Sequence, residues 1–238
     1  KIYVPKAMKI WILQTGEPLH CDKGNLRPMR AINLANSLVK KNYDVVIWSS
    51  SFNHLKKYHR SKKYKVIKIQ KNLEIRLIPS PGYKKHIGLM RLIDHFLLSW
   101  NLKQLLKKEK NLPDVAFIGY PPIETAAVMS RWLKKQNIPI VLDVKDLWPS
   151  IFVDYFHKIT QPIVRIIFYP YFYLARRAGN NSTSIISMTK PFLNWFLDFA
   201  KKSKSKNNRV FPLTSPKVII SKKNFLKAEQ WWSRQGVD

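Results

Sequence analysis

Short apolar runs alternate with segments of helical periodicity along this chain, and that alternation limits its possible folds more than any other feature. Lys9–Gln14 is an apolar run that ends at Thr15-Gly16, and Tyr43–Trp48 is a second one. Between them, from Met29 to Lys41, apolar side chains recur at helical spacing and cations fill the last turn. Strand, helix and strand in succession form a βαβ unit, which predicts a parallel sheet with crossover helices.

The same alternation continues toward the C-terminus, interrupted once by a predicted hairpin. In Lys65–Gln70 and Leu73–Ile78, apolar and polar residues alternate on both sides of Lys71-Asn72. One later helix is expected to kink at Pro170. The other expected elements are strands at Val115–Gly119, Pro139–Val144, Ser184–Met188 and Val210–Leu213, and helices from Leu89 to before Pro113, Ile123–Lys135, Ile163–Ala178 and Pro191–Lys201. Together they predict an α/β fold with a doubly wound, mostly parallel, Rossmann-like sheet.

The length of 238 residues suits one large domain or two small ones. We expect residues 8–215 to form the Rossmann-like domain, with residues 1–7 as upstream or added sequence before Met8. Residues 216–238 are expected to form a linker and a helix that contains Trp231-Trp232. Two large aromatic side chains exposed to water would be a liability, so this segment is expected to pack on a second domain that the chain lacks.

The balance of charge indicates anionic partners. Lys and Arg number 43 against 14 Asp and Glu, and the net charge of +29 steers the protein toward nucleic acid, anionic lipid or phosphorylated substrates. Nucleic-acid binding rests on the isoelectric point of about 10.2, because the chain has no zinc-finger spacing and no RNA-recognition run. A basic nucleic-acid-binding protein and a non-catalytic binding module are therefore the alternatives to an enzyme.

Cysteine and histidine usage limits the chemistry further. Cys21 is the one cysteine, so an intrachain disulfide and a thiolate zinc site are excluded, and a reducing compartment such as the cytoplasm is expected. The 6 histidines show no metal-ligand spacing, so no metal site is expected. The longest apolar stretch, Ile163–Ala175, is interrupted by Arg165 and Pro170 and is too short to span a membrane.

The loops that follow predicted strands are the candidate sites, because open parallel sheets bind ligands beyond the carboxyl ends of their strands. The first such loop carries Gly16 and Arg27 near a helix N-terminus, where an anion can bind. It lacks the dinucleotide-binding and P-loop glycine patterns, so neither of those nucleotide sites is supported. Alternatively it is an ordinary long surface loop. A later loop, Tyr120-Pro121-Pro122, fits a stiff turn before a helix.

The most distinctive strand-end segment is Leu142–Pro149, which places two carboxylates, a lysine and a tryptophan together. Asp146 is ionised at neutral pH and can take a proton from a hydroxyl nucleophile, while Trp148 offers a flat face to a sugar ring. The alternative is that Asp146 caps the following helix or pairs with Lys145.

Three segments of the chain resemble the N-terminal half of family 4 glycosyltransferases. They are Asp143-x-x-Asp-Leu-Trp-Pro149, Asp114-Val-x-x-Ile-Gly-Tyr-Pro-Pro122 and the glycine-containing first loop. The likeness is greatest to members that build bacterial surface polysaccharides such as lipopolysaccharide on lipid carriers, and it covers residues 8–215. It implies one half of a GT-B fold, whose two Rossmann-like domains hold the acceptor and the nucleotide-sugar donor respectively. The donor-site Glu-x7-Glu pattern is absent, so the chain resembles the acceptor half alone.

The resemblance implies that the full-length protein transfers a sugar from a nucleotide-sugar donor to a lipid-linked saccharide acceptor. The expected partner is a C-terminal half that binds the donor, and no cofactor is expected in this chain, which alone would be inactive. Asp146 is the expected catalytic base. The expected acceptor-binding residues are Gly16, Asn25, Arg27, Tyr120, Lys145 and Trp148, with Tyr120 standing where many relatives have histidine.

A lipid-linked acceptor lies at the membrane, so we expect a cytoplasmic protein held peripherally on the anionic inner face of the cell membrane. Aromatic residues between Phe152 and Tyr173, beside cations, suit such an interface. Alternatively these aromatic residues are core and the lysines a solvated face. The cations expected to contact the membrane are Lys56, Lys57, Arg60, Lys62, Lys63, Lys84 and Lys85.

Overall fold

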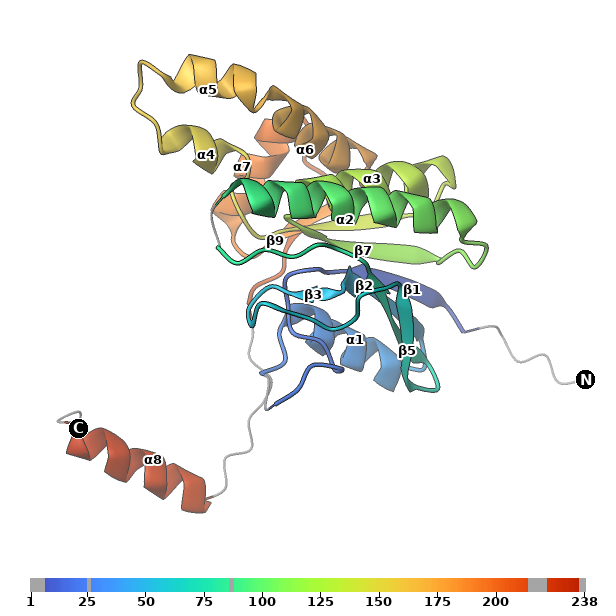
Figure 1. Cartoon of the computed structure of the whole chain (residues 1–238), viewed down its shortest axis with the longest axis vertical. Helices are drawn as coiled ribbons and strands as arrows, with labels where there is room; N and C mark the ends of the chain where they lie inside the picture. The colour runs from blue at the N-terminus through green and yellow to red at the C-terminus, as the bar shows by residue number, and fades with distance from the viewer. Residues whose placement is uncertain (1–6, 25–26, 86–87, 214–221, 236–238) are drawn as a thin grey trace, which may run out of the picture.

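The computed structural model describes residues 7–24, 27–85, 88–213 and 222–235, and one eight-stranded sheet lies at its centre (Figure 1). The strands are β1 (Lys9–Leu13), β2 (Asp44–Ser50), β5 (Lys65–Gln70), β6 (Leu73–Ile78), β7 (Val115–Tyr120), β8 (Ile140–Val144), β9 (Ser184–Ser187) and β10 (Arg209–Val210). Their order is β10-β9-β8-β7-β1-β2-β6-β5, and every neighbouring pair is parallel except the predicted β5–β6 hairpin. The predicted α/β, mostly parallel, Rossmann-like fold is confirmed.

Helices cover both faces of this sheet. The helices of the described residues are α1 (Arg30–Lys40), α2 (Leu89–Lys108), α3 (Ile123–Lys135), α4 (Ser150–Asp154), α5 (Gln161–Ile167), α6 (Tyr169–Asn181), α7 (Lys190–Ala200) and α8 (Lys222–Arg234), the last of which lies apart from the sheet in Figure 1. In Figure 1, α1 lies on one side of the sheet, and α2, α3 and α6 lie on the other. Because both faces are covered, the central strands are continuous apolar runs rather than alternating ones.

Successive side chains of β1 enter different cores, because they point to opposite faces of the sheet. Trp11 belongs to the core beneath α2 and α3, whereas Ile12 packs in the smaller core beneath α1. The Trp11 ring stacks on Trp132 of α3 with centroids 5.9 Å apart and meets Trp48 of β2 edge-on at 5.2 Å. A shift of β1 by one residue would exchange these two sets, so the two cores fix its register.

The structure corrects two expected element boundaries. The helix predicted over Ile163–Ala178 is two helices, α5 and α6, which meet at Phe168. Pro170 lies in the first turn of α6, where its missing N–H removes no helical hydrogen bond, so it starts a helix rather than kinking one. The last strand covers Arg209–Val210 rather than Val210–Leu213.

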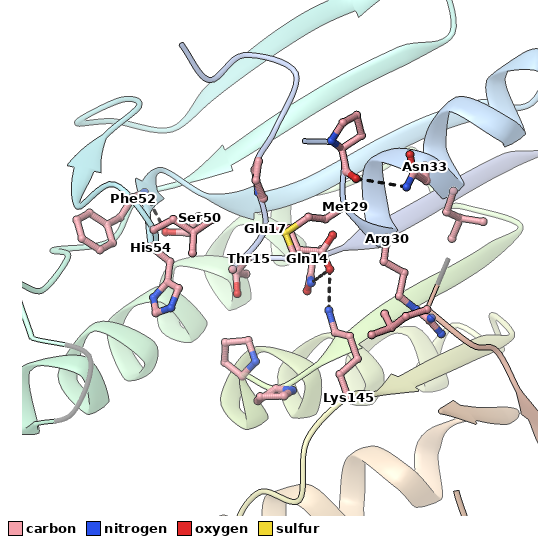
Figure 2. Close-up of a pocket in the computed structure, with 18 of the residues that line it drawn as sticks. Gln14, Thr15, Glu17, Met29, Arg30, Asn33, Ser50, Phe52, His54 and Lys145 are labelled. Carbon is pink, nitrogen blue, oxygen red and sulfur yellow. Dashed lines mark hydrogen bonds and ion pairs between the residues drawn. The ribbon is translucent and has the colours of Figure 1, made fainter. Parts of the chain in front are cut away.

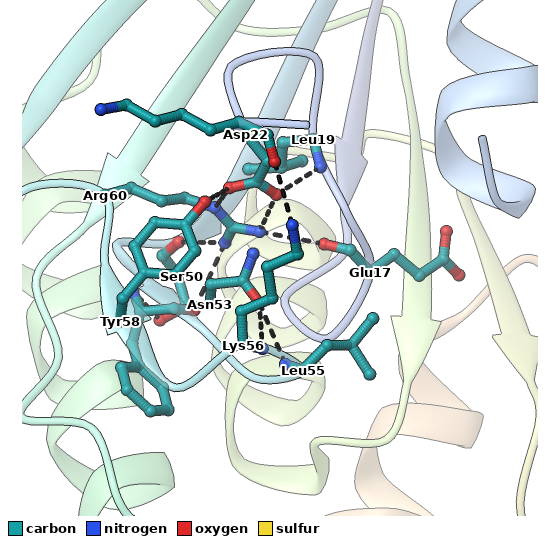
Figure 3. Close-up of polar contacts among 11 residues, drawn as sticks. Glu17, Leu19, Asp22, Ser50, Asn53, Leu55, Lys56, Tyr58 and Arg60 are labelled. Carbon is teal, nitrogen blue, oxygen red and sulfur yellow. Dashed lines mark hydrogen bonds and ion pairs between the residues drawn. The ribbon is translucent and has the colours of Figure 1, made fainter. Parts of the chain in front are cut away.

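A ribbon of two short strands, β3 (Phe52–Asn53) and β4 (Tyr58–His59), was not predicted and is tied to the loop after β1 by a buried ion pair (Figure 3). Arg60 Nη2 lies 2.6 Å from Asp22 Oδ2, and the two side chains are 4% and 0% exposed. The Tyr58 hydroxyl donates to the other Asp22 oxygen at 2.7 Å. Arg60 also donates to the backbone carbonyls of Ser50, Phe52 and Glu17. The prediction that Arg60 contacts a membrane is wrong, because these acceptors and Asp22 enclose its guanidinium.

Helix α8 carries the predicted tryptophan pair at the end of the chain. Trp231 and Trp232 are both exposed, and their rings meet edge-on with centroids 4.6 Å apart. Residues 214–221 lie outside the described residues. The packing of this segment on a second domain therefore stays a prediction.

Replacing Asp22 by Asn is expected to lower the free energy of unfolding by about 3–5 kcal/mol, because it leaves the Arg60 charge buried without its counter-ion. Burial opposes ionisation of Asp22, but hydrogen bonds from Arg60 and Tyr58 prevail and lower its pKa from 3.8 to about 2. The stabilisation is therefore complete above about pH 4 and is lost as the pH falls toward 2.

Urea unfolding of the two proteins across this pH range measures the effect. Asp154, which is exposed on α4, provides the control, and Asp154→Asn should leave the stability unchanged. An equal loss in both variants would show that the Asp22–Arg60 pair has no special role.

Candidate functional site

A cavity of about 1030 Å³ opens where the parallel strands of the sheet end (Figure 2). Its walls come from the loops after β1, β2, β7 and β8, from α1 and α2, and from residues 211–213. The strand order reverses at β1, which lies between β7 and β2. The cavity therefore occupies the topological switch point, the crevice where open α/β sheets bind ligands.

The Glu17 carboxylate organises one wall of the cavity at the first turn of α1. Its Oε2 accepts a hydrogen bond from the Ala31 N–H at 2.8 Å, at the positive end of the helix dipole. Its Oε1 accepts from Lys145 Nζ at 2.9 Å and from the Gln14 side-chain amide (Figure 2). A carboxylate of the protein thus fills the position where this helix would hold an external anion.

A bidentate ion pair joins α1 to the end of β8. Arg30 donates to the two carboxylate oxygens of Asp143 at 2.7 and 2.8 Å. The ring of Phe211 lies 4.1 Å from the Arg30 guanidinium carbon, and Arg30 also donates to the Pro212 carbonyl. Residues 211–213, which were predicted to continue the last strand, therefore form part of the cavity wall instead.

A second polar cluster joins α2 to α3. His95 lines the cavity, and its Nδ1 lies 3.8 Å from Oε2 of Glu124. Both side chains are 6% exposed, and neither atom has a hydrogen-bond partner among the described residues. Burial lowers the pKa of His95 from 6.5 to about 3 and raises that of Glu124 from 4.5 to about 6. The pair combines an imidazole that burial keeps neutral with a carboxyl group that titrates near neutrality, so Glu124 is the member of the pair whose pKa suits a proton acceptor.

Asp94, the residue before His95, also lines the cavity. It accepts hydrogen bonds from the Ser80 hydroxyl at 2.5 Å and the Gly82 N–H at 2.6 Å, which fix the loop before α2. Burial raises its pKa. In the described part of the chain, no three His, Cys, Asp or Glu side chains are grouped to hold a metal ion.

Three of the predicted acceptor-binding residues line the cavity, namely Gly16, Arg27 and Lys145. Asn25 lies outside the described residues. Lys145 reaches the cavity as the partner of Glu17 rather than of Asp146. The structure thus brings the first loop and the β8 loop together, and acceptor binding by these residues stays a prediction.

Two other predicted acceptor-binding residues are core. Tyr120 is fully buried, and its hydroxyl donates to the Trp148 carbonyl at 2.5 Å. The Trp148 ring is 8% exposed, because Arg91 covers it at 4.9 Å and Phe152 packs on it with centroids 4.6 Å apart. Two predictions are therefore wrong. Trp148 offers no free face to a sugar because other side chains cover its ring, and Tyr120 cannot contact an acceptor because it is buried in the core.

Asp146, the predicted base, is not among the described residues that line the cavity. Its Oδ1 accepts a hydrogen bond from the Leu147 N–H at 2.8 Å, and burial raises its pKa. The carboxylate thus holds the backbone of its own loop, and its catalytic role stays a prediction.

The His95–Glu124 pair was missed because each residue has an ordinary explanation in the sequence. Helical spacing places Asp94 and His95 off the apolar stripe of their helix, which predicts a solvated face, and Glu124 fits a first-turn acid at a helix start. The available signal was that Asp94 and His95 stand together in a stretch, Leu92–Leu98, whose other residues are all apolar.

No family model matches the chain, and no curated protein matches it. Solved structures do. A sucrose-phosphate synthase chain of Thermosynechococcus elongatus aligns with 97% of this chain and 100% of its own, at 10% identity and a TM-score of 0.50. The catalytic domain of Arabidopsis thaliana starch synthase IV, bound to ADP and acarbose, aligns with 88% of this chain at 12% identity and a TM-score of 0.52.

Arabidopsis thaliana UGT89C1, complexed with quercetin, aligns with 96% of this chain at 12% identity and a TM-score of 0.51. The chain has the fold of one half of a GT-B glycosyltransferase. It spans only 52% of the starch synthase chain and 55% of the UGT89C1 chain. Identities this low show a shared fold, so substrates have to be argued from the cavity itself.

Glu124→Gln is expected to stabilise the protein at about pH 8 and to leave its stability unchanged below about pH 4.5. The folded protein keeps a proton on Glu124 between pH 4.5 and about 6 that the unfolded chain has lost, so the free energy of unfolding falls as the pH rises through this window. The amide removes that loss because it never ionises.

Urea unfolding at several pH values measures this effect, with Glu229→Gln as a control on the exposed surface of α8. If Glu124→Gln is instead less stable than the parent at pH 8, the folded protein stabilises the ionised carboxylate, and the account of its raised pKa is wrong.

Proposed function

We propose that the chain is the acceptor-binding half of a glycosyltransferase that acts in the synthesis of a cell-surface polysaccharide. The observation that carries the proposal is the buried His95–Glu124 pair at a cavity of a half GT-B fold. Such a pair can take the proton that an acceptor hydroxyl loses during transfer. Buried titratable groups with shifted pKa values cluster at catalytic sites, and this favours an enzyme over a module that only binds.

In the proposed reaction, the oxygen of an acceptor hydroxyl forms a bond to the anomeric carbon of the donor sugar. The bond from that carbon to the nucleoside diphosphate breaks, and the diphosphate leaves with the electron pair. The hydroxyl proton passes to Nε2 of the neutral His95 imidazole while the Nδ1 proton passes to the Glu124 carboxylate, so the imidazole stays neutral. Glu124, whose Oε2 lies across a 3.8 Å gap from Nδ1, has a pKa of about 6 and holds the proton at the end of the step.

The nucleotide-sugar donor is proposed to bind a C-terminal half that completes the GT-B fold. Glu17 already occupies the N-terminus of α1, so a diphosphate there would meet a negative charge. The amides and hydroxyl of Gln14, Asn33 and Thr15 line the cavity and suit the hydroxyls of a saccharide. This division of the substrates leaves the chain inactive without its other half.

The acceptor is proposed to be linked to a lipid, and the protein to work peripherally at the cytoplasmic face of the cell membrane. The net charge of +29 favours an anionic surface. Apolar side chains, among them Leu34, Leu55 and Leu213, line the cavity beside its polar groups. They offer contacts for the first part of a lipid chain next to the saccharide.

Calorimetric titration of this chain with a polyprenyl-diphosphate-linked saccharide, and separately with a nucleotide sugar, tests the assignment. We expect the saccharide to bind and the nucleotide sugar to show no binding. Binding of the nucleotide sugar alone would make this chain the donor half and overturn the proposal.

His95→Gln is expected to lower kcat by about 10²–10⁴-fold in a protein that joins this chain to its donor-binding half. The Michaelis constant for the acceptor should change little, because glutamine keeps much of the shape of the side chain. Initial rates of sugar transfer measure both quantities.

Asp146→Asn is the matched comparison, since Asp146 hydrogen-bonds to its own loop. It should keep kcat within about threefold of the parent, below the effect of losing a general base. A large loss in Asp146→Asn with an active His95→Gln would return the role of base to Asp146.

A further inference from the structure

We propose that one apolar face of the protein docks on an anionic lipid bilayer. This docking face consists of the N-terminal half of α2 and the segment from Tyr155 to Tyr169. Its exposed apolar residues are Leu89, Met90, Ile93, Phe96, Leu97, Trp100, Tyr155, Phe156, Ile159, Ile163, Ile166, Ile167 and Tyr169.

Helix α5 has an unusual outer surface for a protein in water. Ile163, Ile166 and Ile167 are all exposed, the second of them at 74%, while Val164 is the buried residue of this short helix. Ile159, in the turn before it, is 80% exposed. Four exposed isoleucines this close in sequence form a patch of the kind that marks an interaction surface.

Helix α2 has two apolar faces. Leu98, Leu102 and Leu106 are buried in the core. Leu89 and Phe96 lie seven residues apart, and Leu89 is 72% exposed. Because residues at this spacing share a side of a helix, the outer side of α2 is apolar as well as the inner one. An apolar outer side on a surface helix requires a second apolar environment.

Direct contacts connect α2 to the second part of the docking face. The Arg91 guanidinium lies 4.9 Å from the centre of the Trp148 ring, and the Trp148 and Phe152 rings are 4.6 Å apart. Phe152 in turn stacks on Phe168 at 5.3 Å. The two parts are therefore supported by one aromatic cluster, and Figure 1 shows α2, α4 and α5 on the same side of the sheet.

The charges on this face match an anionic surface. The Tyr155–Tyr169 part of the docking face carries Lys158 and Arg165 and no Asp or Glu, and the exposed Asp154 directly before it is the acid nearest in sequence. Asp94, the one acid of α2 before its C-terminus, is buried. Cations beside exposed apolar groups are typical of protein surfaces that lie in the lipid headgroup region.

Three of the cations predicted to contact a membrane border this face. Lys57, Lys84 and Lys85 line one hollow together with Leu89 and Met90. Tyr83 and Arg91 line both this hollow and the cavity, so the docking face adjoins the candidate acceptor site. No described helix is long and apolar enough to cross a bilayer. The shared lining residues place the cavity beside the docking face.

The inference rests on the proposed function only for the location of the acceptor. Binding to lipid that contains no acceptor tests it separately, so the two proposals can fail independently. The full chain is sedimented with vesicles of phosphatidylcholine alone, and with vesicles of equal parts phosphatidylcholine and phosphatidylglycerol. The test variant combines Leu89→Ser, Ile163→Ser and Ile166→Ser, all at exposed positions, and circular dichroism checks its folding.

The parent protein is expected to bind the anionic vesicles, and the triple variant to bind them at least about tenfold more weakly, because three apolar side chains no longer enter the lipid. A control with Val66→Ser and Leu112→Ser, at exposed apolar positions elsewhere, should bind as the parent does. Replacing Lys84 and Lys85 by Gln should weaken binding to the anionic vesicles only.

Several results would overturn the inference. Equal binding by the triple variant and the parent would show that the face does not enter lipid. Loss of binding in Trp231→Ser with Trp232→Ser would assign the lipid contact to α8. Displacement of the protein from vesicles by duplex DNA would favour nucleic acid as its partner. Sedimentation velocity tests self-association: if the parent associates and the triple variant does not, this face is an interface between two copies of the chain.

Discussion

The Glu17 carboxylate is the interaction on which the geometry of the cavity depends. One of its oxygens satisfies a backbone donor at the start of α1, and the other binds Lys145 from the loop after β8. Glu17 thereby fixes the loop after β1, helix α1 and the loop after β8 to one another. From the other side, the buried Asp22–Arg60 pair holds the same loop against β4. A polar cavity with fixed walls can orient a substrate with little loss of conformational entropy.

The sequence predicts the sheet well because both of its faces are buried. Continuous apolar runs such as Tyr43–Trp48 have no other place in a compact fold, so strands and crossover helices follow from periodicity alone. The site was predicted only in part, since its key contacts join residues distant in the chain. Glu17 and Lys145 are separated by 128 positions, and no local pattern identifies their ion pair. The position of Trp148 just after a strand predicts an exposed ring, whereas Phe152 and Arg91 cover it.

The cavity and the docking face give a single account of how the protein could meet its acceptor. Tyr83 and Arg91 belong to the walls of both the cavity and the hollow beside α2. A saccharide in the cavity would therefore lie close to the headgroups beneath the docking face, with its lipid anchor left in the bilayer. Under this proposal, cations that border the docking face, such as Lys84 and Lys85, would add to the lipid contact of its exposed isoleucines, which alone would bind lipid weakly.

The central claim is that the cavity at the strand ends holds the saccharide acceptor, and photo-crosslinking tests it most directly. A lipid-linked saccharide that carries a photoreactive group on its terminal sugar is irradiated with the chain, and mass spectrometry locates the label. We expect the label on residues that line the cavity, with Met188 and Leu213 among the accessible positions, and we expect unlabelled saccharide to compete. Labelling outside the cavity that the unlabelled saccharide still suppresses would contradict the account.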